Sequence, residues 1–113
     1  MTGPPHAFVH EAELVMDGEA DERAPGGAIT VALCGHWEHE GSCRWPHNNA
    51  IALEGRWARL RTVFVAPPED EETVRERIER GLRSGADWEV VSVGARPLAP
   101  DEEELAERLT RAL

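Results

Sequence analysis

Hydrophobic and polar residues alternate in the first part of the chain. Between residues 7 and 16, Ala12, Leu14 and Met16 occupy alternate positions, and an Asp-Gly turn signal follows. A period of two is typical of a strand with one buried face. The segment also fits the stripe of an amphipathic helix, but its shortness favours a strand. Residues 18–27, rich in Gly, Glu, Asp, Ala and Pro, are expected to form a mobile acidic loop.

Two further segments alternate in the same way. In residues 28–37 the large aliphatic side chains fall on one phase, and Cys34 and His36 fall on the other. A strand there would place that cysteine and histidine side by side on one face. Residues 50–66 predict one long strand. Its apolar phase changes near residues 58–60, which indicates a bulge or a sharp bend.

The period changes to that of a helix after a pair of prolines. Val74, Ile78 and Leu82 lie at i, i+4 and i+8, which predicts a helix with one buried stripe and an acid-rich start. Residues 88–95 return to a strand pattern. Residues 101–113 predict a second helix with a leucine stripe.

This element order, β-β-β-α-β-α, predicts an α+β fold. We expect a single domain over residues 1–113, built as a two-layer sandwich. Its sheet would have about four mostly antiparallel strands, with two helices on one face. The other face would be bare, and a second copy of the chain or a loop would cover it; with a second copy, the protein is a homodimer.

Composition narrows the function classes. The formal net charge is -10, and all twelve basic side chains other than histidine are arginines. Nucleic-acid and anionic-membrane binding need clustered basic residues, so neither is expected. The sequence contains no apolar run of the ~20 residues that a membrane-spanning helix requires. The first residues carry no signal-peptide pattern, so a cytoplasmic location is expected.

One stretch, residues 34–47, concentrates both cysteines and three of the five histidines. Zinc takes four ligands drawn from thiolate, imidazole and carboxylate groups. If residues 38–49 form a loop that folds back on the preceding strand, these donors can converge on one ion. The sequence therefore predicts a metal site, with zinc as the first choice, whose candidate ligands are Cys34, His36, His39, Cys43 and His47.

Two other interpretations of this stretch stay open. Cys34 and Cys43 can form a disulfide, or the cysteines and histidines can serve as ordinary packed and solvated residues without a metal. In the metal-free case a neighbouring histidine can also activate a cysteine thiolate as a nucleophile. The spacing C-x-H-x2-H-x3-C-x3-H matches none of the common zinc-finger patterns.

Aromatic and basic residues near this stretch suggest a ligand pocket. Trp37 and Trp45 lie beside the candidate ligands, next to His36 and two residues before His47, and Arg56 and Arg59 lie on the predicted long strand close to Arg61. A pocket between loop 38–49 and the sheet would bind a small molecule, with the arginines holding a carboxylate or phosphate. The alternative roles are structural: the tryptophans cover the core, and the arginines pair with acids on the adjacent strand. The hypotheses are thus a metal-binding domain, a small-molecule binder or enzyme, and a dimeric interaction module.

Overall fold

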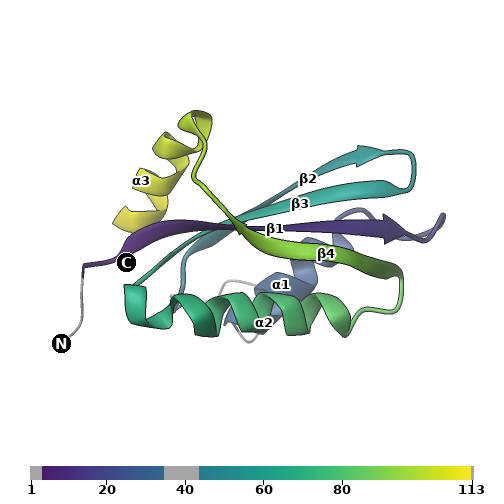
Figure 1. The fold of residues 1–113 in the computed structure, drawn as a ribbon, viewed down its shortest axis with the longest axis horizontal. Coiled ribbons are helices and arrows are strands. Elements are labelled where there is room, and N and C mark those ends of the chain that lie inside the picture. The colour runs from purple at the N-terminus through teal and green to yellow at the C-terminus, as the bar shows by residue number, and fades with distance from the viewer. Residues whose placement is uncertain (1–3, 35–43, 113) are drawn as a thin grey trace.

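The computed structural model describes residues 4–34 and 44–112. These residues form one sheet with helices on both faces (Figure 1). No helix in these two ranges is long and apolar enough to cross a bilayer. In chain order the elements are β1 (His6–Met16), α1 (Ala24–Cys34), β2 (His47–Glu54), β3 (Trp57–Ala66), α2 (Glu71–Arg83), β4 (Trp88–Arg96) and α3 (Glu103–Arg111). Single 3-10 turns, Pro68–Asp70 and Pro100–Glu102, lead into α2 and α3.

The four strands form a sheet in the order β2-β3-β1-β4, and each neighbouring pair is antiparallel. β1 and β2 therefore run parallel, with β3 between them and α1 as the crossover. This split β-α-β unit, repeated as β3-α2-β4 around β1, is the connectivity of ferredoxin-like folds. The predicted α+β class and the antiparallel sheet of four strands are confirmed.

The predicted strand at residues 28–37 is wrong, because residues 24–34 form the helix α1. α1 begins inside the segment that we expected to be a mobile loop, with Pro25 in its first turn, where the missing N–H of proline costs nothing. The eleven residues are uncharged and mostly apolar, so they fit both periods. The burial follows the helical period: Ile29 and Leu33, four residues apart, lie in the main core, whereas Val31, which a strand would place on the same face, is 46% exposed.

The predicted single strand over residues 50–66 is also wrong, because it is a hairpin of β2 and β3. Glu54 pairs with Trp57, and the two-residue turn between them contains Gly55 at φ 61°. A positive φ at Gly55 but not at Arg56 is the signature of a type II′ turn, which favours glycine at its first central position. The change of apolar phase that we attributed to a bulge is this turn.

The two faces of the sheet carry different helices. α1 and α2 cover one face, called here the helix face, and α3 lies against one end of the opposite, outer face (Figure 1). Two helices thus share a face as expected, but the C-terminal helix is not one of them. The main core fills the helix face. Its larger members are Leu14, Met16, Ile29, Leu33, Trp45, Leu60, Phe64, Val74, Ile78 and Leu82.

Candidate functional site

The structure places two of the five predicted metal ligands. Cys34 ends α1 and His47 begins β2, and 3.9 Å separates the Cys34 Sγ from the His47 Nδ1. Cys34 is disulfide-bonded. His36, His39 and Cys43 lie outside the described residues, as does Trp37. Within residues 4–34 and 44–112, no three His, Cys, Asp or Glu side chains gather as a metal site requires.

His47 takes part in a hydrogen-bond chain that ties α1 to the sheet. Its Nδ1 lies 3.0 Å from the Trp45 carbonyl oxygen, so Nδ1 carries the proton and donates it. Its Nε2 then accepts from the Thr30 Oγ1 at 3.1 Å. Asn49 continues the chain: its amide donates to the Gly26 carbonyl at 3.0 Å, and its oxygen accepts from Thr62 at 2.8 Å. These contacts give His47 a structural role in positioning α1.

Trp45 has the packing role that we considered as the alternative to ligand binding. Its side chain is buried in the main core. The indole Nε1 donates to the Asp70 carboxylate at 3.2 Å, so the polar atom of this buried ring is satisfied. The guanidinium groups of Arg44 and Arg77 lie 4.8 and 4.9 Å from the ring centroid. Trp45 therefore fixes the chain before β2 against α2.

The predicted cluster of arginines divides between two places. Arg56 stays at the hairpin end, where its Nε donates to the Met16 carbonyl at 2.8 Å. Arg59 and Arg61 instead point from β3 onto the outer face and meet Glu11 on the adjacent strand β1. This is the cross-strand pairing with an acid that the sequence suggested. β4 supplies a third arginine, Arg96, whose Nε lies 3.5 Å from the same carboxylate.

Glu11 is the centre of this outer-face cluster. Its carboxylate is only 10% exposed, and three guanidinium groups surround it. Arg61 makes the closest contact, 2.8 Å from the Oε2, whereas the Nε atoms of Arg59 and Arg96 approach the Oε1 at 3.8 and 3.5 Å. A buried carboxylate is tolerable only with such partners.

Arg61 links the sheet to the segment that leads into α3. Its Nε and Nη2 donate to the two oxygens of Glu102 at 3.0 and 2.7 Å, a bidentate pair. These hydrogen bonds from Arg61 hold the pKa of the Glu102 carboxyl below its ordinary value, and hydrogen bonding to Glu102 raises the pKa of Arg61. Both side chains thus stay charged throughout the physiological pH range.

A cleft of about 740 Å³ opens between this cluster and the segment from Pro97 to Leu105. Its volume lies within the roughly 300–1,000 Å³ typical of small-molecule sites. Three arginines and three acids line it, so the cleft is electrically neutral although the whole chain carries -10. Val63, Leu98 and Leu105 add an apolar wall. We call this site the arginine cleft.

Sequence reasoning found Arg59 and Arg61 but missed the rest of the arginine cleft. Glu11, Arg96 and Glu102 come from other elements, and only the strand order β3-β1-β4 brings them together. The alternating phase of the first segment already places Glu11 opposite the apolar row, which is the one signal that was available.

Comparisons with protein-family models, with curated proteins and with solved structures found no match to this chain.

Proposed function

We propose that this domain binds a small anionic molecule in the arginine cleft. The observation that carries the proposal is the convergence of three guanidinium groups on one buried carboxylate. One carboxylate neutralises one of these cations, and Glu102 neutralises a second. Asp101, the third acid of the cleft, forms no ion pair among the described residues, so Glu11 alone faces both Arg59 and Arg96, and the position beside its Oε1 is locally positive in a cleft that is neutral as a whole.

Arg59 and Arg96 are the two side chains that would hold the anion. They are 58% and 47% exposed, whereas Arg61 is 26% exposed and already engaged by two acids. Their contacts with Glu11 use the Nε atoms at long range. The terminal amino groups of a guanidinium are a planar fork that suits a carboxylate or phosphate, and such charged hydrogen bonds are roughly twice as strong as neutral ones.

The walls of the cleft specify the remainder of the ligand. Val63, Leu98, Leu105 and the prolines of the segment before α3 are apolar and rigid, and none of the described residues that line the cleft is aromatic. An aliphatic body would gain from burial here, whereas a purine or other flat ring would find no stacking partner. The favoured ligand is an amphipathic anion with an aliphatic tail, such as a fatty-acid carboxylate or an alkyl phosphate.

Calorimetric titration with octanoate and with octyl phosphate tests this function. The wild-type protein should bind at least one of them, and octan-1-ol, which has no charge, should bind more weakly. The double variant R59Q/R96Q should lose about tenfold or more in affinity, since about 1.4 kcal/mol corresponds to one decade. R83Q changes the net charge by one unit away from the cleft and should bind like wild type. Equal affinity of the R59Q/R96Q variant and wild type would refute the proposal.

Metal binding by the stretch around Cys34 is a second candidate. The 3.9 Å approach of the Cys34 Sγ to the His47 Nδ1 favours it, although the imidazole would have to exchange its hydrogen bond with Trp45 or Thr30 for the metal. Zinc needs the thiolate, so the disulfide of Cys34 must first be reduced by a thiol or phosphine reductant. Elemental analysis of the reduced protein should give about one zinc per chain, as a tetrahedral site predicts. Absence of zinc under these conditions would remove this candidate.

A further inference from the structure

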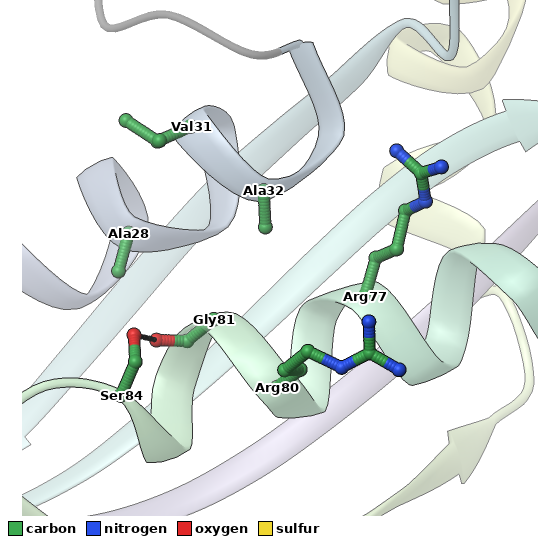
Figure 2. A pocket seen from close by; sticks show the side chains of 7 residues that line it. All are labelled: Ala28, Val31, Ala32, Arg77, Arg80, Gly81 and Ser84. Carbon is green, nitrogen blue, oxygen red and sulfur yellow. Dashed lines mark hydrogen bonds between the residues drawn. The ribbon is translucent and has the colours of Figure 1, made fainter.

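A second surface with a distinct composition lies between α1 and α2. Figure 2 shows Ala28 and Ala32 on α1 facing Gly81 on α2, with Arg77 and Arg80 extending from α2 beside them. The helices approach closely here: a Cβ on Gly81 would lie 3.0 Å from the Ala32 Cβ and from a backbone oxygen of α1. The small side chains leave a groove of about 390 Å³ on the outside of this contact.

The α1 wall of this groove is apolar although it faces solvent. α1 contains no charged residue, and Val31 on its outer side is 46% exposed. Helices on a protein surface normally present charged or polar residues to water, and an apolar face marks a contact surface. Val31 can gain from burial only if something docks on the groove.

The α2 wall is cationic. Arg77 and Arg80 are three residues apart and project along the same side of the helix. Among the described residues neither forms an ion pair, whereas Arg75 on the same helix pairs with Glu71 at 2.9 Å. Arg77 instead lies over the Trp45 ring, and that contact holds its guanidinium at the rim of the groove. The groove therefore combines an apolar floor with two cations that lack acidic partners in the part of the chain described.

We propose that the groove between α1 and α2 binds an acidic amphipathic helix of a partner protein. Small apolar side chains of that helix would pack against Ala28, Val31 and Ala32, and its carboxylates would pair with Arg77 and Arg80. This is recognition of a helix in a groove, with anchors at i, i+3 and i+4. A nucleic acid would not use the apolar wall, and the net charge of -10 opposes a long polyanion.

The probe is a synthetic helical peptide of about 14 residues, close to the average helix length. It carries alanine and leucine on one face and glutamate on the other. Amide NMR shifts of the wild-type protein are followed during titration. We expect shifts concentrated at Ala28, Val31, Ala32 and Gly81, and weaker binding as salt rises. The same peptide with lysine in place of glutamate should bind at least about tenfold more weakly.

Two variants and a matched control make this test specific. Val31→Asp removes the exposed apolar anchor, and Arg80→Glu reverses a cation; each should weaken peptide binding about fivefold or more. Arg108→Glu on α3 changes the net charge by the same amount, and it should leave the affinity unchanged. Thermal unfolding verifies that the three variants fold. The proposal fails if the shifts lie elsewhere, if Arg108→Glu has the same effect as Arg80→Glu, or if the peptide does not bind.

Discussion

The two faces of the sheet bury different kinds of side chains. The helix face is filled by aliphatic and aromatic residues under α1 and α2, with Phe64 fully buried and 5.4 Å from the Phe8 ring. The outer face buries Val9, Val63 and Val65 and then turns ionic at Glu11 and the arginine cleft.

Apolar packing dominates the helix face and needs no specific partner; His10, which contacts Arg75 and Glu79, is the buried ionisable group on that face. The outer face depends on particular pairs of charges, since a buried carboxylate without its cations would be costly. The main core and the arginine cleft therefore lie on opposite faces of the same four strands. The losses of stability caused by substitutions should therefore differ between the two faces, both in size and in their dependence on salt and pH.

The largest effect should follow from a cavity on the helix face. Phe64→Ala removes a fully buried ring from the centre of the sheet and should lower the free energy of unfolding by about 4 kcal/mol. Because no charge is involved, urea unfolding in low and high salt should give the same loss. A loss below about 1 kcal/mol would mean that this face is not the main core.

Breaking the ionic face should cost somewhat less. Arg61→Leu leaves Glu11 and Glu102, which are 10% and 15% exposed, without their closest cation. We expect the free energy of unfolding, measured with urea, to fall by about 3 kcal/mol, as it does when other buried ion pairs lose one partner. Arg59→Leu is the matched control: its side chain is 58% exposed and 3.8 Å from Glu11, so it should cost under about 1 kcal/mol. Equal losses in the two variants would contradict the central role of Arg61.

A buried histidine on the helix face should make the stability of the fold fall in acid. His10 is 3% exposed on the helix face, its Nδ1 accepts from Arg75 at 2.9 Å, and its Nε2 lies 3.2 Å from the Glu79 carboxylate. Burial, and secondly the charge of Arg75, lower the pKa of His10 below 6.5. The unfolded chain then binds the proton more readily, so stability should fall as pH drops below about 6.5 toward the folded-state pKa.

Urea unfolding between pH 7.5 and 5.0, a range that brackets the ordinary histidine pKa of about 6.5, measures this dependence. The variant His10→Gln should lose most of it, and His6→Gln, at the exposed start of β1, should keep it. An unchanged pH dependence in His10→Gln would assign it to other groups.

The smallest effect on stability is expected at the uncovered part of the outer face. Trp57 is 42% exposed and Val91 is 48% exposed, and Trp57→Ser should change stability by less than about 0.5 kcal/mol. The predicted homodimer would use this bare area. Sedimentation equilibrium should then show a dimer for wild type and a weaker dimer for Trp57→Ser. A monomeric wild-type protein would contradict the prediction of a homodimer.

The sequence predicted an element correctly where its hydrophobic pattern fitted one kind of secondary structure better than the other. The helix α2 has a clean period, and its buried residues Val74, Ile78 and Leu82 were predicted correctly. The segment of β1 also fitted a helix; its alternating row was predicted correctly, but the strand buries Val9, His10 and Glu11 as well. α1 is apolar on nearly every side, so alternation at Ile29, Val31 and Leu33 fitted a strand equally well. Pro25 in the first turn was the helix signal that we overlooked.

The candidate site was less accessible to prediction than the fold. The cysteines and histidines of residues 34–47 are close together in the sequence and therefore easy to single out. In the structure, however, both ring nitrogens of His47 make structural contacts, with Trp45 and Thr30. The arginine cleft assembles from three strands and the segment before α3, and nothing local in the sequence links Glu11 to Arg96 or Glu102. Long-range juxtaposition of this kind follows from strand order, which a single sequence does not contain.

Anion binding in the arginine cleft can be mapped residue by residue from the amide NMR shifts of the wild-type protein during titration with octyl phosphate. We expect shifts confined to β3 from Arg59 to Val63, to Glu11 and Arg96, and to the segment from Pro97 to Leu105, with the groove between α1 and α2 unaffected. Shifts on the helix face instead, or shifts that persist unchanged in R59Q/R96Q, would contradict anion binding in the arginine cleft.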